Sequence, residues 1–154
     1  MTSMPEMVAI FNGFGGIASL LVGSAEYVSG TFDNPAFLGA IFVTVLIGGI
    51  TFTGSIVAYG KLSEIISGRP FLYKGQQFVN GLLVLSILLV GANMLYIQGF
   101  ISAEQTLMLL LALAFLLGIL FVIPIGGADM PVVIALLNSF SGLAACAAGF
   151  VILN

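Results

Sequence analysis

The sequence predicts an all-α protein, a polytopic bundle of transmembrane helices with five spans. Of its 154 residues, 60% are hydrophobic and 6% are charged, and the mean hydropathy is +1.26. A soluble domain carries roughly 25% charged residues, so this chain has too few charges to cover a water-exposed surface. No segment has the alternation of apolar and polar residues that is typical of membrane β-barrel strands, which leaves helices as the spanning elements.

Five stretches approach the length of about 20 mostly apolar residues that a helix needs to cross a bilayer. The predicted spans are residues 7–28, 36–59, 78–97, 106–123 and 132–153. Glycine, proline and polar residues separate them, as expected of connecting turns. We therefore expect residues 1–154 to form a single membrane domain, with no nucleotide-binding domain.

The basic residues predict how the bundle is oriented. All three of them, Lys61, Arg69 and Lys74, fall between the second and third predicted spans. Because basic residues gather in loops on the cytoplasmic side, this connection is predicted to face the cytoplasm, or the matrix in a mitochondrion. With five spans, the N-terminus and the connection at residues 124–131 then face the same inner side.

The composition also excludes several kinds of chemistry. The chain has no histidine, and its one cysteine, Cys146, lies in an apolar stretch. Zinc, haem and Cys–His catalysis therefore have no ligands here, and we expect no metal site and no catalytic residue. Three basic residues give no electrostatic footprint for nucleic acid, and no glycine-rich phosphate loop is present. We expect no cofactor to bind to this chain itself.

Small residues at four-residue spacing predict which helices pack closely. They recur in the first, second and fifth spans, where they let helix backbones approach each other. We therefore predict a tight inner group of these three spans, with the leucine-rich third and fourth spans toward lipid. The predicted packing positions are Gly15, Ser19, Gly23, Gly48, Gly54, Gly142 and Gly149.

Three neutral polar residues are predicted to lie at one depth in the membrane. Asn12 follows Pro5 by seven residues, Asn138 follows Pro131 by seven, and Ser55 precedes Lys61 by six. At 1.5 Å per residue, each is about 9–11 Å from the inner boundary. They can form a hydrogen bond that holds helices together, worth about 0.6–2 kcal/mol, or line a hydrated path for a proton or small ion. Composition alone favours the first interpretation.

The connection before the fifth span contains a carboxylate and two glycines. Asp129 precedes Pro131 and can cap the following helix, where it interacts favourably with the helix dipole. Gly126 and Gly127 allow another chain to approach the backbone closely, as a docking loop requires. Both interpretations of this connection stay open on the residues alone.

Three blocks of sequence, in order along the chain, carry a resemblance to a known family. They are residues 4–10 (MPEMVAI), residues 51–62 (TFTGSIVAYGKL) and residues 125–150, which include IGGADMPVV and LNSFSG. Together they resemble the membrane domain of the beta subunit of proton-translocating nicotinamide nucleotide transhydrogenase. The chain is similar to a middle portion of that subunit, five helices out of about nine.

The resemblance implies a function and partners. The family couples hydride transfer from NADH to NADP with proton translocation across a bacterial or mitochondrial inner membrane. NAD and NADP bind in partner domains, and the implied partners are those domains, the other membrane helices and further copies of the whole complex. The alternative, from a different class, is a structural or channel-like helix module with no redox partner.

The resemblance also implies roles for individual residues. Ser55 and Asn138 match positions that line the proton path, while Asp129 and Glu6 match acidic residues of the inner surface linked to coupling with the NADP domain. Asn12 departs from the family, because many members have a histidine there that is thought to bind the proton. Asparagine and serine do not titrate near neutral pH. The sequence therefore predicts that a neighbouring membrane chain supplies the titrating group.

Overall fold

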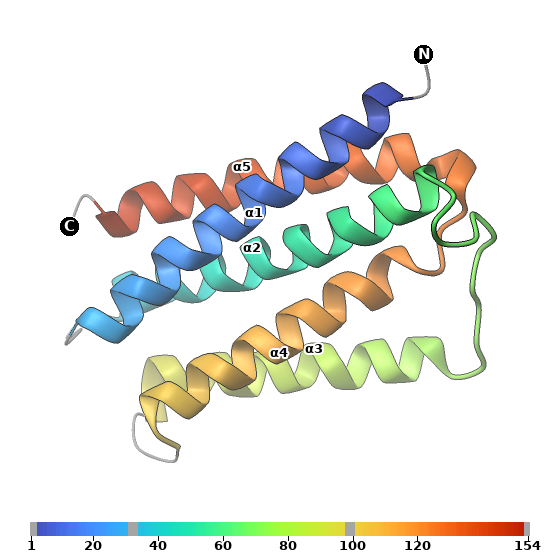
Figure 1. Cartoon of the computed structure of the whole chain (residues 1–154). Coiled ribbons are helices and arrows are strands. Elements are labelled where there is room, and N and C mark those ends of the chain that lie inside the picture. Colours follow the sequence, from blue (N-terminus) through green and yellow to red (C-terminus); the bar gives the residue numbers. More distant parts are fainter. Residues whose placement is uncertain (1–2, 31–33, 98–100, 153–154) are drawn as a thin grey trace.

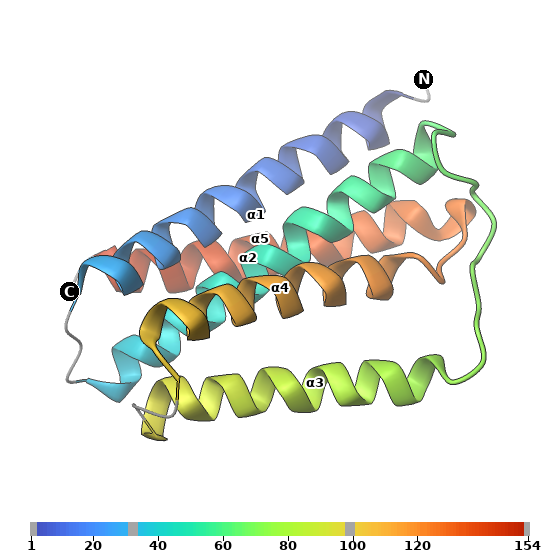
Figure 2. The ribbon, with the colours of Figure 1, turned by 60° about the horizontal axis from the view of Figure 1, so that its bottom comes forward.

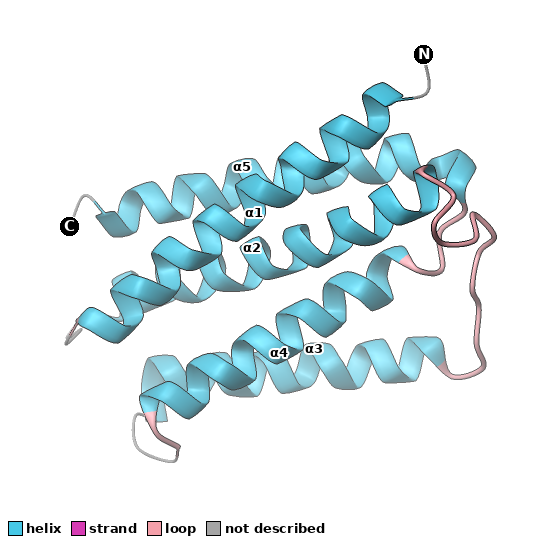
Figure 3. Cartoon of the chain, viewed as in Figure 1, coloured by secondary structure: helices cyan, strands magenta, loops and turns pink. Residues whose placement is uncertain are grey.

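The computed structural model describes residues 3–30, 34–97 and 101–152, which are almost entirely helical (Figure 1). A short π-helix, η1, follows the third long helix, and a 3₁₀ turn, η2, precedes the fifth. No strand occurs in these ranges (Figure 3). The elements are α1 (Ser3–Ser29), α2 (Pro35–Leu62), α3 (Gln76–Ala92), η1 (Asn93–Ile97), α4 (Ala103–Val122), η2 (Gly127–Asp129) and α5 (Met130–Ile152).

All five predicted spans are confirmed as helices that are long and apolar enough to cross a membrane. The protein is therefore an integral membrane protein of the multi-pass kind. Each helix begins before its predicted span, because first turns are polar and a search for apolar residues passes over them. Asn34 caps α2 by accepting a hydrogen bond from the Ala36 amide at 2.9 Å. Ser102 and Gln105 form a reciprocal capping box at the start of α4.

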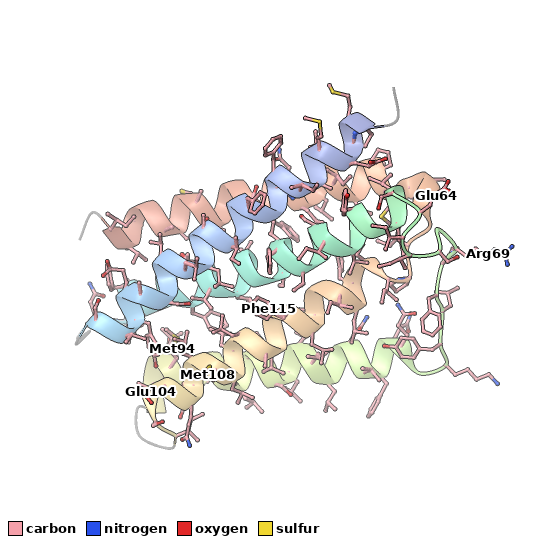
Figure 4. All side chains as sticks on the ribbon, viewed as in Figure 1. Glu64, Arg69, Met94, Glu104, Met108 and Phe115 are labelled. Carbon is pink, nitrogen blue, oxygen red and sulfur yellow. The ribbon has the colours of Figure 1, made fainter. Side chains whose placement is uncertain are left out.

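Successive helices run in opposite directions through the bundle. The start of α1, the connection between α2 and α3, and the connection between α4 and α5 lie at one end (Figure 1). The end of α1, the start of α2, the end of η1, the start of α4 and the end of α5 lie at the opposite end. Figure 4 places Glu64 and Arg69 at the first end and Glu104 at the second. This arrangement is the one predicted from five alternating spans, and the side that faces the cytoplasm stays a prediction.

Helix α2 is the centre of the bundle, and it packs against α1, α4 and α5 (Figure 2). Where α1 crosses α2, a Cβ atom on Gly48 would lie 2.7 Å from the carbonyl oxygen of Gly16, and one on Gly16 would lie 2.9 Å from that of Gly48. The two backbones touch directly, as only glycine allows. Helix α5 packs on both α1 and α2, as the predicted inner group requires.

The prediction that α4 lies toward lipid is wrong. Helix α4 packs along α2, with Ala114 against Gly49 and Gly118 against Thr53. A Cβ atom on Gly118 would lie 2.6 Å from the carbonyl oxygen of Ile50. The surrounding leucines hid this small-residue pair from sequence analysis. Helix α3 packs mainly on α4 and, as predicted, exposes leucines on its outer side: Leu82, Leu85, Leu88 and Leu89.

The predicted packing positions separate into two groups. Gly23 and Gly54 lie at close contacts, since Cβ atoms there would be 3.0 Å from Thr44 and 3.2 Å from Leu137. Gly48 lies at the α1–α2 crossing, and Ser19 is buried, its hydroxyl donating to the Gly15 carbonyl. The structure does not place the other three at close contacts within the described chain. A Cβ atom would meet nothing within 4 Å on Gly142 or Gly149, and only Ser141 at 3.9 Å on Gly15.

Two apolar clusters lie at opposite ends of α2, and a polar segment separates them. One cluster joins the first half of α2 to α3 and α4, through residues that include Ile41, Ile87 and Leu110. The other joins the second half of α2 to α1 and α5, through residues that include Ala9, Val57 and Leu137. Residues 48–55 of α2 lie between them and bury glycine, threonine and serine instead of large side chains. The candidate site lies at the end of this segment.

Candidate functional site

A buried hydrogen bond joins α1 to α2 within the bundle. The Asn12 side-chain amide donates to the Ser55 hydroxyl at 3.0 Å, and the two residues are 5% and 1% exposed. Gly13 lies beside them, and a Cβ atom there would be 3.4 Å from the Ser55 Cβ. The close approach of the helices thus allows the short asparagine side chain to reach across. Two of the three polar residues predicted to lie at one depth are brought together.

Two oxygen atoms near this hydrogen bond have no partner among the described protein groups. They are Oδ1 of Asn12 and Oγ1 of Thr51, which lies one turn before Ser55 on α2. Thr44, by contrast, donates its hydroxyl to the carbonyl four residues earlier. A buried polar group left unpaired costs about 1–3 kcal/mol. The α1–α2 interface therefore retains hydrogen-bonding capacity that water or a donor on another helix can use. Sequence analysis did not identify Thr51.

A cavity of about 160 Å³ adjoins Ser55. It is partly open and mostly apolar, and its lining includes Gly13 and Phe14 of α1 and Phe52 and Tyr59 of α2. Its accessible lining is apolar, and an apolar cavity of this size stays dry, so this space fits an apolar side chain better than ordered water. Ser55 borders this space with its apolar atoms, while its hydroxyl accepts the hydrogen bond from the Asn12 amide.

Asn138 is not part of this site within the described chain. It is exposed on α5 and lines a groove of about 380 Å³ between the first turns of α1 and α5. Pro5, Val8 and Ile134 are among the groove's other lining residues. Its separation from Pro131 predicted how deep Asn138 lies in the membrane, but that separation does not specify the direction in which the side chain points.

Lys61 joins the α2–α3 and α4–α5 connections, which lie at the end of the bundle where α1 begins. This residue is 4% exposed, and its ammonium group donates to the carbonyl oxygens of Ile123 and Ile125. The Gly127 amide also donates to the Gly68 carbonyl at 2.8 Å. Sequence analysis used Lys61 to orient the bundle and to place Ser55 in depth, and gave it no structural or functional role. Its signal was a cation placed in the last turn of an otherwise apolar helix.

The two predicted coupling residues lie at this end as well. Asp129 is exposed at the end of η2, and its carboxylate makes no hydrogen bond to any described residue. It does not cap α5, because η2 continues directly into that helix. The capping interpretation is therefore not supported, and the carboxylate is free to meet another chain. Glu6 is half-buried in the first turn of α1.

A second buried asparagine lies near the opposite end of the bundle. The Asn93 amide donates to the Thr106 hydroxyl at 3.1 Å, and Thr106 donates in turn to the Ser102 carbonyl. The Tyr27 side chain also interacts with that of Thr106. Asn93 begins the π-helix η1, and its buried Oδ1 atom has no partner among the described residues. This cluster was missed, because Asn93 was a single polar residue inside a predicted span.

Comparison with known proteins decides the family. The family model described as NAD(P) transhydrogenase beta subunit matches residues 1–154. The chain belongs to this family. The resemblance to the transhydrogenase beta subunit that the three sequence blocks indicated is thus confirmed.

Relatives in the NAD(P) transhydrogenase family are longer than this chain. Two sequences from Rhodospirillum rubrum, each named NAD(P) transhydrogenase subunit beta, are 40% identical to it over 164 aligned positions. The alignments cover 100% of this chain and 34% of each relative. The chain therefore spans about a third of the length of the curated relatives it matches.

Proposed function

We propose that this chain is the proton-conducting membrane part of a transhydrogenase that couples hydride transfer from NADH to NADP with proton translocation. NAD and NADP bind in partner domains, and this chain performs no hydride chemistry. Its partners are those domains, the remaining membrane helices and further copies of the complex, in a bacterial or mitochondrial inner membrane. Family membership along the whole chain and five membrane-spanning helices support the proposal.

The observation that carries the proposal is the buried contact between Asn12 and Ser55. A structural hydrogen bond in lipid needs only a donor and an acceptor, whereas this one leaves Asn12 Oδ1 unpaired and lies beside a cavity. Asn12 Oδ1 accepts an N–H, and the Ser55 hydroxyl both donates and accepts. This pair can therefore orient water molecules and stabilise a cationic donor, although neither side chain changes its charge.

The titrating group is proposed to come from a neighbouring membrane helix, most simply as a histidine that faces Asn12. An imidazolium has two N–H donors, and one of them directed at Asn12 Oδ1 would favour the protonated form. Deprotonation returns that nitrogen to an acceptor and releases the contact. Asn138, exposed on α5, is available to the same water or the same neighbour. Asp129 and Glu6 are proposed to connect the inner surface to the NADP domain.

The test uses the complete complex reconstituted in liposomes, with proton pumping and hydride transfer measured together. Asn12→Leu and Ser55→Ala should each lower the protons pumped per hydride by about tenfold or more, equivalent to about 1.4 kcal/mol. Ser139→Ala is the matched control, because this exposed serine of α5 donates only to the Ala135 carbonyl within its own helix. Unchanged pumping in both Asn12 and Ser55 variants would leave the pair as a structural contact.

A second experiment addresses the titrating group. Every membrane-depth His, Asp and Glu of the partner chains is neutralised in turn, and pumping is expected to be lost for at least one of them. In that background Asn12→His should restore part of the pumping, because it returns a titrating imidazole to the same contact. Pumping that survives all the neutralisations would assign proton carriage to this chain instead.

A further inference from the structure

Lys61 is the one basic residue of its connection that is removed from water. It is 4% exposed, whereas Arg69 and Lys74 are exposed. A buried ammonium group costs several kcal/mol unless hydrogen bonds replace its hydration. Both acceptors that Lys61 finds among the described residues are backbone carbonyls, those of Ile123 and Ile125. The cation is thus bound by the connection between α4 and α5.

The location of these carbonyls explains why a cation is favourable there. Ile123 is the C-terminal cap residue of α4, and Ile125 follows two residues later. The end of a helix has unpaired carbonyls and a partial negative charge, which attract a lysine. Lysine carries three donors on one compact group, so it can bind both carbonyls at once.

Backbone contacts add to the link between the two connections. The Phe71 amide donates to the Ile123 carbonyl at 3.3 Å, and the Gly127 amide donates to the Gly68 carbonyl at 2.8 Å. A Cβ atom on Gly127 would lie 3.4 Å from the Gly68 Cα, so the backbones are in contact. The connection that carries Asp129 is therefore attached to the segment that leaves α2, and Lys61 is the side chain of α2 itself that holds it.

Lys61 and Ser55 are on the same helix, six residues or about 9 Å apart along its axis. Ser55 is the partner of Asn12, and Asp129 follows Ile125 by four residues. Two residues before Ser55, the Thr53 hydroxyl donates to the Phe115 carbonyl of α4 at 3.0 Å. Because a helix transmits displacement along its axis, a movement of the Asp129 connection reaches Ser55 through Lys61.

We propose that Lys61 is a positioning residue for coupling, which ties the connection at residues 123–129 to α2 so that displacement of this connection moves Ser55 relative to Asn12. The inference rests on the proposed function and adds to it the side chain that links the inner surface to the proton path. In this role Lys61 does not transfer protons across the membrane. It acts through Ser55.

The test compares Lys61→Met, Lys61→Arg and Lys74→Met in the complete complex in liposomes, with protons pumped per hydride transferred as the readout. Methionine retains an unbranched apolar chain but donates no hydrogen bond, so the ratio should fall about fivefold or more, the lower end of typical coupling energies. Hydride transfer without a proton gradient should persist. Arginine should restore most of the ratio, because its guanidinium can donate to two carbonyls. Lys74→Met removes the same charge from the same connection and should leave the ratio unchanged.

A ratio that stays at the wild-type value in Lys61→Met, or that falls equally in Lys61→Met and Lys61→Arg, would overturn the inference. If Lys61→Met does not assemble, Gly127→Leu provides the test, since it separates the two connections while Lys61 stays in place. Its ratio is expected to fall, and an unchanged ratio would contradict the proposal. Asn12→Leu is measured in parallel. Loss of pumping there with full coupling in the Lys61 variants removes only the inference, and retained pumping there removes the proposed function.

Discussion

Two buried asparagines of this chain make nearly the same hydrogen bond in different surroundings. Asn12 donates to Ser55 at 3.0 Å and Asn93 donates to Thr106 at 3.1 Å, in each case across two helices and with Oδ1 unpaired. The first pair lies between the closely packed α1 and α2. The second joins the end of α3 to the start of α4, at the edge of the bundle.

The acceptors, more than the asparagines, distinguish the two sites. The Thr106 hydroxyl accepts from Asn93 and donates its proton to the Ser102 carbonyl. The Ser55 hydroxyl accepts from Asn12 and makes no further hydrogen bond with the described residues. A saturated hydroxyl, whose proton is already donated, fixes two helices in place, whereas one with an unused donor can exchange hydrogen bonds with water. We therefore expect Asn93 to matter for stability and Asn12 for proton movement.

The largest expected effect concerns which end of the bundle faces inward. In a Cys146→Ala background, Leu72→Cys should react with an impermeant thiol reagent from the inner side alone, and Glu104→Cys from the outer side alone. Both positions are exposed; Leu72 is in the α2–α3 connection at one end of the bundle, and Glu104 is at the start of α4 at the other (Figure 4). The prediction follows from the basic residues of the α2–α3 connection. The opposite labelling pattern would place Asn12 near the outer side and remove the coupling role of Asp129.

The next effect separates the two asparagines by their activity. Asn12→Leu should lower protons pumped per hydride by about tenfold or more, while Asn93→Leu should leave that ratio within about twofold, a difference of about 1 kcal/mol. The measurement is made on the reconstituted complex at equal amounts of folded protein. Equal losses in the two variants would show that the saturated and unsaturated hydroxyls do not differ in function.

Disrupting the Gly16–Gly48 contact between α1 and α2 is expected to have a smaller but measurable effect on stability. Gly48→Ala should lower the free energy of unfolding in detergent by about 1–3 kcal/mol, because the new methyl group meets the Gly16 carbonyl and the α1–α2 contact must open. Gly142→Ala is the matched control on α5, where a Cβ atom meets nothing within 4 Å. If both alanines are tolerated equally, the direct backbone contact is not what holds α1 and α2 together.

Sequence analysis predicted the helices and their order more completely than the faces they turn to each other. Length and hydropathy sufficed for five spans. Small residues at four-residue spacing indicated that α1 and α2 pack closely, but the α1 glycine at the crossing is Gly16, which the predicted positions did not include. The lipid is as apolar as the protein interior, so a membrane helix that is apolar on all sides gives no signal for its rotation. For this reason Asn138 was grouped with residues that it does not contact, and Gly118 was assigned to a helix facing lipid.

Other residues were missed because their role depends on contacts far apart in sequence. Lys61 binds carbonyls 62 and 64 positions later, and backbone carbonyls are present at every residue. Nothing in the sequence therefore marks its partners. Thr51 looks like any helical threonine, and only the structure identifies its hydroxyl as one that does not bond to its own helix.

The smallest expected effect tests the structural half of the comparison. A double-mutant cycle of Asn93→Leu and Thr106→Val should give a coupling free energy of about 0.6–2 kcal/mol for unfolding in detergent, the range for hydrogen bonds between membrane helices. Each single variant removes the Asn93–Thr106 bond, so the double variant should cost less than the sum of the two. Strictly additive losses would mean that the Asn93–Thr106 bond contributes nothing, and the contrast with Asn12 would then lie in packing instead of in hydrogen bonding.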